Sequence, residues 1–433
     1  MISPVWPFRP SKIPFFYGWV IWIISTLGIL FSIPGQTMGL AVFTESFIDV
    51  LGLTRTQLSL AYLAGTLGSA LFLAKAGKWY DQLGGRVMIS AASIALSLMI
   101  LYISFIDIIR LTLGGPSFIS FLLILIGYFG VRFFGQGILT SCSRNVLLLW
   151  FVKRRGLVSG ARSVFVSLGF SLAPLLLASL IATYGWRESL WILSLLGGVG
   201  FSFLALIFIR DNPESCGLRA DGSDSKSDEE FQLETPSQTL EQAKLNPIFW
   251  IYSLSLSMHA MFGTAIVFHI VAIFSEAGKT SSEAFSYFIP AAIFSTIANL
   301  CASWIADKIS LKPILIIMLI TFCFGSWGLI NLELSWGFWL LAFGFGVGGG
   351  LWGVISNLAF IRFFGPRHLG EISGFSTSLT VFASAIGPAA FSLGYDYFGT
   401  YTMSAKICLV FLIFLLGAAL LLNQKEDGQL DSN

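Results

Sequence analysis

Gly156-Leu-Val-Ser-Gly160 and Gly370-Glu-Ile-Ser-Gly374 are two versions of one five-residue pattern, 214 positions apart in a chain of 433 residues. Further pairs follow at the same spacing: Pro174 and Pro388, and Tyr184-Gly185 and Phe398-Gly399. A constant offset held over about thirty residues is difficult to obtain by chance. It implies that the chain is built from two similar halves, with these stretches in equivalent positions.

The composition places most of the chain in lipid. Hydrophobic residues make up 55% of it and charged residues only 11%, whereas soluble domains carry roughly 25% charged residues. The net charge of +2 does not indicate a nucleic-acid partner. The five cysteines lack the spacing of a metal site. We therefore expect the lipid bilayer as the main environment, with no nucleic-acid partner, no metal and no cofactor.

Twelve apolar runs are long enough to cross a bilayer, which needs about 20 apolar residues in a helix. They lie at 17–43, 57–76, 87–108, 119–148, 157–181, 188–210, 247–273, 284–305, 312–331, 336–361, 372–395 and 401–423. The first run is longer than the core of a cleaved secretion signal, so we expect it to stay in the membrane. The sequence predicts an all-α membrane protein with twelve transmembrane helices in two six-helix pseudo-symmetric halves.

A polar, acidic stretch separates the two halves. We predict an N-terminal six-helix half at 1–210, a cytoplasmic, partly disordered linker at 211–246 and a C-terminal six-helix half at 247–433. Lys and Arg are enriched in cytoplasmic loops. With the N-terminus inside, 18 of them, Arg162 included, fall in inside segments and 5 in outside segments. This bias predicts a multi-pass protein of the plasma membrane with both termini in the cytoplasm.

The polar loop after the second run reads Gly77-Lys-Trp-Tyr-Asp81-Gln-Leu-Gly84-Gly85-Arg86. It resembles the signature loop of the major facilitator superfamily, whose pattern is Gly, then Asp, then Gly and basic residues. Glycines permit a tight turn with positive φ, and Asp81 can accept hydrogen bonds from Arg86 or from a nearby helix N-terminus. The resemblance implies transport by alternating access. We assign gating roles to Gly77, Asp81, Gly84 and Arg86.

Other stretches are similar to one branch of that superfamily, the monocarboxylate transporters and oxalate/formate antiporters. They are Tyr17-Gly-Trp-Val20, Trp150-Phe-Val-Lys-Arg-Arg-Gly156, Tyr184-Gly-Trp-Arg187, Pro213–Gly222 and Phe363–Gly370. The resemblance implies small carboxylate anions as solutes, moved with a proton or by exchange. The run at 284–305 differs, because it holds none of the charged residues that this branch often carries there.

Arg132, Gln136, Thr140 and Arg144 in the fourth run are spaced by four and share one slowly drifting helix face. An arginine at the bilayer centre costs at least about 2.5 kcal/mol, and the predicted runs hold no carboxylate deep enough to pair with it. We expect this face to bind an anionic solute, since a guanidinium matches a carboxylate. The alternative is that one of the two arginines reaches the headgroups instead.

Weaker candidates lie in other runs. Gln36, Asn299 and Asn357 are predicted solute contacts. Pro34 and Gly35 interrupt the first run and predict either a gate hinge or a kink that serves packing. His259 is the proton-coupling candidate, because histidine titrates near neutral pH. The alternative is a histidine packed at an interface.

These features favour a secondary active transporter of small organic anions, monocarboxylates above all, acting as a symporter or antiporter. Its ligands would be a small-molecule solute and a coupled proton. Two alternatives stay open: an exporter of an uncharged or amphipathic drug-like solute, and a non-transporting membrane sensor. The sequence has no HExxH, paired carboxylates or Walker loop, so we expect no catalytic residues and no enzyme.

Overall fold

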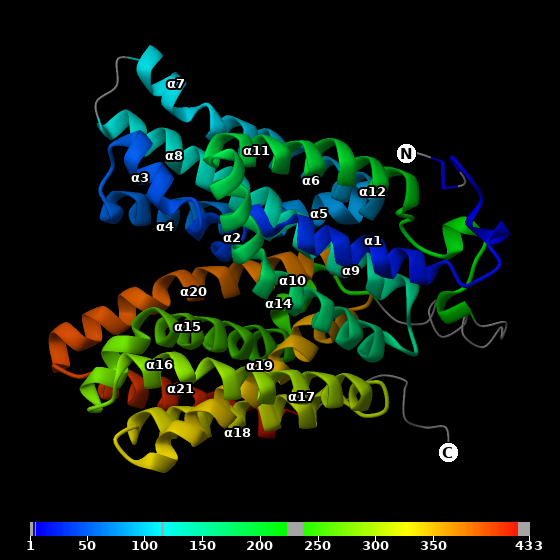
Figure 1. Cartoon of the computed structure of the whole chain (residues 1–433). Coiled ribbons are helices and arrows are strands. Elements are labelled where there is room, and N and C mark those ends of the chain that lie inside the picture. The colour runs from blue at the N-terminus through cyan, green and yellow to red at the C-terminus, as the bar shows by residue number, and fades with distance from the viewer. Residues whose placement is uncertain (1–2, 5, 114–116, 223–236, 423–433) are drawn as a thin grey trace. The chain divides into compact units, whose positions relative to one another are not determined.

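The computed structural model describes residues 3–4, 6–113, 117–222 and 237–422 (Figure 1). Helices make up 85% of it, and the described residues form no strand. Eleven helices are long and apolar enough to cross a membrane. A twelfth span results if the helices Gln57–Leu71 and Leu73–Leu83, bent by 46°, count as one. The predicted all-α membrane fold is therefore confirmed.

The helices form two compact units, described separately here. Unit 1 contains Met1–Lys153, Val164–Glu234 and Pro366–Ser378; unit 2 contains Arg154–Ser163, Thr235–Gly365 and Leu379–Asn433. Two long helices, α10 (Arg155–Tyr184) and α20 (Leu369–Phe398), each contribute to both units. Their first turns carry the repeated five-residue pattern. The first turns of each helix thus belong to a different unit from the rest of it.

Unit 1 packs α4 against α8, α1 against α9, and α6 against α11 and α12. Its helices are α1 (Gly18–Phe31), α2 (Thr37–Ala41), α3 (Thr44–Leu51), α4 (Arg55–Leu71), α5 (Leu73–Leu83), α6 (Gly85–Ser104), α7 (Ile106–Thr112), α8 (Ser117–Val131), α9 (Thr140–Trp150), α11 (Trp186–Leu195) and α12 (Ser202–Phe208). The π-helices η3 (Arg132–Leu139) and η4 (Leu196–Phe201) join α8 to α9 and α11 to α12.

Two predicted boundaries in unit 1 were wrong. The first run does not continue to residue 43: α1 ends at Phe31 and the short 3-10 turn η2 (Ile33–Gly35) follows, since Pro34 has no N–H for the helix. The predicted loop at 77–86 is mostly helical, because α5 continues to Leu83. Only Gly84 makes the expected turn, with a φ of 83° that favours glycine.

Unit 2 packs α19 against α17 and α18, and α21 against α15 and α18. Its helices are α14 (Leu240–Leu245), α15 (Pro247–Glu276), α16 (Ser281–Ser286), α17 (Phe288–Ala306), α18 (Leu311–Ile330), α19 (Ser335–Phe364) and α21 (Tyr401–Leu421). Glycines in α19 permit this close packing. A Cβ at Gly344 would lie 2.2 Å from the backbone nitrogen of Gly325.

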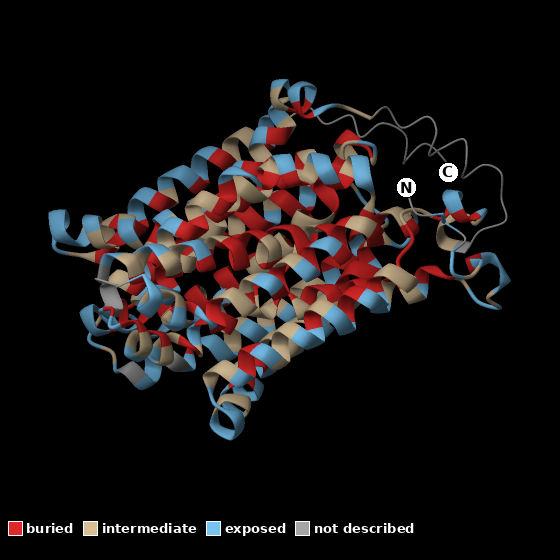
Figure 2. Cartoon of the chain, turned by 90° about the horizontal axis from the view of Figure 1, so that it is seen from above, coloured by how far each residue is buried: buried red, intermediate tan, exposed pale blue. Residues whose placement is uncertain are grey.

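Exposed residues lie on helix faces turned away from the packed helices, and buried residues lie between helices (Figure 2). Large apolar side chains are among the most exposed, including Leu175, Phe268, Leu393 and Phe414. Such faces suit contact with lipid, where apolar side chains cost nothing to expose and helices satisfy their own backbone groups.

Candidate functional site

Arg132 begins η3 and is buried in unit 1. Its Nη1 donates to the carbonyl of Gly35 at 3.2 Å and lies 3.4 Å from the hydroxyl of Thr37. The guanidinium also lies over the ring of Tyr62, 5.1 Å from its centroid. Its Nε has no hydrogen-bond partner among the described residues. Arg132 is thus held by neutral groups that leave its charge uncompensated.

The break at Pro34 brings Gln36 against the fourth span. Gln36 Nε2 donates to Ser32 Oγ at 3.0 Å and to Thr140 Oγ1 at 3.2 Å, and Thr140 donates to Ser32 at 3.0 Å. Gly35 allows this approach, because a Cβ there would lie 2.3 Å from the carbonyl oxygen of Val131. Two predicted solute contacts, Gln36 and Thr140, therefore bind each other.

Arg144 and Gln136 differ from Arg132. Both side chains are half-buried, and across the described residues neither has a hydrogen bond or ion pair. In α9, Arg144 lies on the face between Thr140 and Ser141, as helical spacing requires. The π-turns of η3 shift the register before this face, so the predicted stripe has an anchored end at Arg132 and a free end at Arg144.

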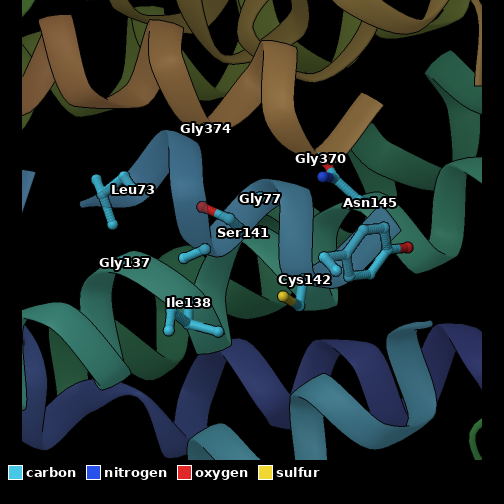
Figure 3. Close-up of a pocket in the computed structure, with 11 residues that line it drawn as sticks. Leu73, Gly77, Gly137, Ile138, Ser141, Cys142, Asn145, Gly370 and Gly374 are labelled. Atoms are coloured by element: carbon cyan, nitrogen blue, oxygen red, sulfur yellow. The ribbon is translucent and has the colours of Figure 1, made fainter. Parts of the chain in front are cut away.

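Unit 1 contains a small pocket (Figure 3). α5, η3, α9 and the first turns of α20 line it, with Tyr80, Ser141 and Asn145 among the polar side chains. Asn145 Nδ2 donates to Ser373 Oγ at 3.1 Å, and the buried Tyr80 hydroxyl has no partner in the described structure. The cavity volume is about 10 Å³, which is enough for at most one water molecule.

Asp81, the central residue of the predicted gate, caps a helix N-terminus. Its Oδ1 accepts the N–H of Gly370 at 2.8 Å and its Oδ2 accepts that of Glu371 at 2.9 Å. Both N–H groups belong to the first turn of α20, where anions are favoured. Gly77 lets α5 approach, since a Cβ there would lie 1.9 Å from the carbonyl oxygen of Gly370.

Arg86 does not bind Asp81, contrary to one sequence-based alternative. Its backbone N–H donates to Asp211 at 2.8 Å. Its guanidinium donates to carbonyl groups of Ser3, Trp6 and Leu206. Burial raises the pKa of Asp211, while the Arg86 N–H and the nearby arginine charges oppose that rise. Arg86 therefore holds the chain's N-terminal segment and α12 within unit 1.

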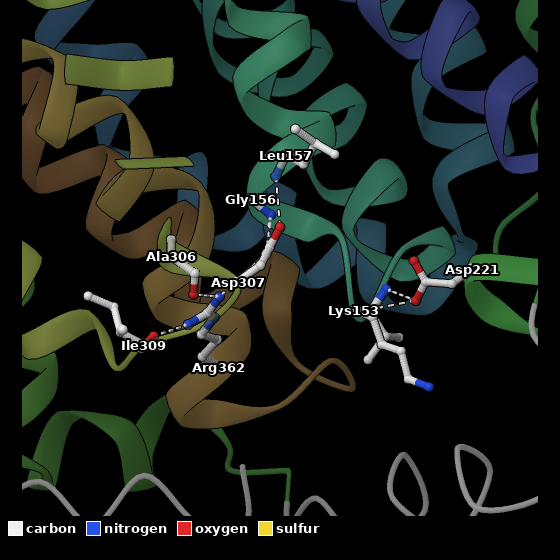
Figure 4. Close-up of polar contacts among 9 residues, drawn as sticks. Lys153, Gly156, Leu157, Asp221, Ala306, Asp307, Ile309 and Arg362 are labelled. Atoms are coloured by element: carbon white, nitrogen blue, oxygen red, sulfur yellow. Dashed lines mark hydrogen bonds and ion pairs between the residues drawn. The ribbon is translucent and has the colours of Figure 1, made fainter. Parts of the chain in front are cut away.

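Unit 2 contains a counterpart of the Asp81 cap (Figure 4). Asp307 accepts the N–H of Gly156 at 2.7 Å and of Leu157 at 2.9 Å, in the first turn of α10. Arg362 lies 3.7 Å from the same carboxylate. Gly156 and Leu157 precede Gly370 and Glu371 by 214 residues. Asp307 had no role in the sequence-based prediction, because it lies 226 residues after Asp81 and not at the repeat offset of 214.

The other predicted contacts lie in unit 2. Asn357 Nδ2 donates to Gly353 at 2.8 Å, and its Oδ1 lies 3.5 Å from Nη2 of Arg162. Asn299 Nδ2 donates to Gly350 at 3.0 Å. Sequence analysis counted Arg162 as a loop cation, but it is buried inside α10. Its place within the run 157–181 was the signal that it belongs to the interior.

His259 lies among aromatic rings of unit 2. It stacks on Phe322 with 4.6 Å between centroids, and Trp352 lies 5.5 Å away. Its buried Nδ1 has no hydrogen-bond partner among the residues described. These contacts hold the ring in place but offer its Nδ1 no acceptor for a second N–H.

Known proteins resemble the chain in family and fold. The family model described as Major Facilitator Superfamily matches residues 25–388. A search of curated proteins gave no match. Similar solved structures include the proton:xylose symporter XylE (15% identity, 93% of this chain and 94% of that one, TM-score 0.70). A bacterial homologue of the iron transporter ferroportin is 16% identical over 92% of this chain and 98% of that one, with a TM-score of 0.71. The human organic anion transporter MFSD10 is 15% identical over 94% of this chain and 99% of that one, with a TM-score of 0.59.

Proposed function

Because the chain belongs to the Major Facilitator Superfamily, whose members are transporters and not enzymes, we propose that it carries small organic anions across the membrane. Monocarboxylates are the first class to test. The observation that supports an anionic solute is Arg144, a half-buried guanidinium inside a span with no partner among the described residues. A carboxylate would supply that partner in matching geometry.

The charges and polar groups of the fourth span favour an anionic solute. Arg132 adds a second cation in the same span, also without a carboxylate among the described residues. Each unpaired arginine in the bilayer costs roughly 2.5–3.5 kcal/mol, and a bound anion reduces this cost. Gln136 offers a further free polar group on the same span. We assign the anion to Arg144, with Arg132 raising the local positive potential.

The helix caps support alternating access. α10 and α20 each contribute residues to both units, and the first turns of each belong to a different unit from the rest of the helix. Asp81 and Asp307 hold those turns and would define one conformation of the cycle. The plasma-membrane location with both termini in the cytoplasm, and the gating roles of Gly77, Gly84, Pro34 and Gly35, belong to the same proposal.

Uptake into proteoliposomes tests the solute class. Labelled monocarboxylates, neutral sugars and amphipathic drug-like compounds would be compared with and without a pH gradient, because the structural neighbours are described as sugar, iron and organic anion transporters. We expect saturable carboxylate uptake whose apparent affinity falls in Arg144→Gln. Uptake of only uncharged or amphipathic compounds would favour the exporter alternative. Binding without any uptake would favour a sensor.

A further inference from the structure

A histidine other than His259 has polar partners at both ring nitrogens. Nε2 of His269, in α15, lies 3.0 Å from the carbonyl oxygen of Pro388 and 3.3 Å from Oγ of Ser392, both in α20. Nδ1 lies 3.4 Å from the hydroxyl of Tyr401, the first residue of α21. One imidazole thus joins three helices of unit 2.

These partners accommodate two protonation states. A carbonyl only accepts, so Nε2 carries a hydrogen in either state. In the neutral ring, Nδ1 accepts a hydrogen bond from the Tyr401 hydroxyl. When a proton from water binds Nδ1, the new N–H donates to the same oxygen, whose hydrogen rotates away. The His269 side chain is half-buried.

The carbonyl that His269 contacts belongs to Pro388, where the hydrogen bonding of α20 is interrupted. Pro388 has no N–H, so it cannot bond the carbonyl of Ser384 one turn earlier. Ser384 is fastened to α15 by its side chain, 2.7 Å from Oγ1 of Thr264. A Cβ at Gly387 would lie 2.2 Å from the carbonyl oxygen of Met261. α15 therefore supports α20 around its proline, and His269 makes the bond that depends on charge.

Charged groups of both signs lie on the helices around this cluster. Glu276 of α15 accepts the N–H of Tyr401 at 3.0 Å. Asp396 of α20 lies within electrostatic range of Tyr401. The ring of Tyr395 stacks on the ring of Tyr401, with 4.6 Å between their centroids. Beyond the end of α15, Nζ of Lys279 lies 3.8 Å from Oε1 of Glu283 in α16. Other ionisable groups on the helices that pack near α15 include Glu241 and Lys244 of α14, Lys312 and Cys323 of α18, Arg362 of α19, Tyr397 of α20, and Lys406 and Cys408 of α21.

We propose that His269 is the proton-binding site through which transport responds to pH, with the proton held between Tyr401 and an imidazole bonded to Pro388. The proposal rests on the transport function proposed above. Protonation strengthens a hydrogen bond to α20, the helix whose first turn Asp81 caps. By linkage, a conformation that shortens this bond binds the proton more tightly.

Histidine NMR tests the site without reference to any solute. The chain has three histidines, so labelled histidine gives three ring signals that single His→Gln variants assign. We expect the His269 signal to change with pH as a proton binds the ring. In Tyr401→Phe, which removes an acceptor for the imidazolium, this pH response should change, whereas Tyr395→Phe should leave it as in the wild type. A His269 signal that does not titrate overturns the proposal.

Transport provides the second measurement. In His269→Gln, an amide N–H can still donate to Pro388 and an amide oxygen can still accept from Tyr401, but no proton binds. We expect this variant to keep exchange activity and lose its pH dependence, while His259→Gln and His368→Gln keep the wild-type profile. An unchanged profile in His269→Gln overturns the proposal. If no carboxylate is transported, the proposed function fails. The NMR measurement still tests, independently of transport, whether His269 binds a proton.

Discussion

The carboxylate of Asp81 accepts the backbone N–H of Gly370 at 2.8 Å, across 289 residues of sequence. Asp307 makes the equivalent bond to Gly156 at 2.7 Å, across 151 residues. The two donors are separated by the repeat offset of 214 residues. Each half of the chain therefore supplies an aspartate that caps the repeated helix of the other half.

Asp81→Asn should slow the transport cycle more than it weakens solute binding. The asparagine amide can accept only one of the two N–H bonds and loses the charge that the helix N-terminus favours. A lost cap of this kind costs about 1 kcal/mol. Exchange rates in proteoliposomes and calorimetric binding would be measured on the same preparation. Asp307→Asn is the matched variant, and we expect a defect of the same type.

A change in affinity with an unaltered exchange rate would contradict this role for Asp81. A defect in Asp81→Asn with none in Asp307→Asn would show that the two caps are not equivalent.

Gly77→Ala should destabilise the protein and reduce exchange. Its Cβ would lie 1.9 Å from the carbonyl oxygen of Gly370, so α5 and α20 must separate, at a cost of about 1–3 kcal/mol. Gly417→Ala is the control, because a Cβ there has nothing within 4 Å and alanine favours the helix. Thermal unfolding in detergent compares the two. Equal melting temperatures would refute the close-packing argument.

Reporter fusions test the orientation. Of the cations that the sequence analysis assigned to loops and chain ends, 18 lie in segments predicted inside and 5 in segments predicted outside. Fusions at the C-terminus and within the linker should therefore be active only with a cytoplasmic reporter. Activity of an external reporter at the C-terminus would reverse the assignment.

The sequence predicted the spans well, because a bilayer demands long apolar helices whatever their packing. It failed where tertiary contacts decide. α5 continues through Lys78 and Asp81 as a helix because the start of α20 packs against it and satisfies Asp81. The π-helix at Arg132–Leu139 has no reliable sequence signal. Pro34 was recognised as a break, but not the short helices that follow it.

The candidate site was predicted in its residue types more than in its contacts. Spacing by four identified the arginines, yet could not tell that Arg132 is bound by Gly35 while Arg144 is free. That difference depends on the break in the first span. Arg162 was predicted to lie in a cytoplasmic segment because it is a charged residue near the end of a predicted span, whereas it is buried in α10. His269 was not assigned a role, since its partners Pro388 and Tyr401 lie more than a hundred residues away.

Arg132→Ala should abolish transport and also lower the melting temperature. The guanidinium holds the carbonyl of Gly35 and packs on Tyr62, so its loss loosens the first span as well as removing a charge. Arg132→Lys should retain little activity, because an ammonium does not reproduce the planar contact with the ring. Transport by Arg132→Ala at the wild-type rate would remove this residue from the site.

Arg144→Gln should separate solute binding from stability. Arg144 makes no hydrogen bond or ion pair with the described residues, so its loss removes no internal polar contact and should leave the melting temperature unchanged or higher. A hydrogen bond to a charged group contributes about 1.5–3 kcal/mol, and 1.4 kcal/mol corresponds to tenfold in affinity. Carboxylate affinity should therefore fall by about 10- to 100-fold. Gln136→Ala, which removes a neutral side chain from the same span, is the control and should lose far less. Equal losses in both variants would show that the charge of Arg144 does not bind the solute.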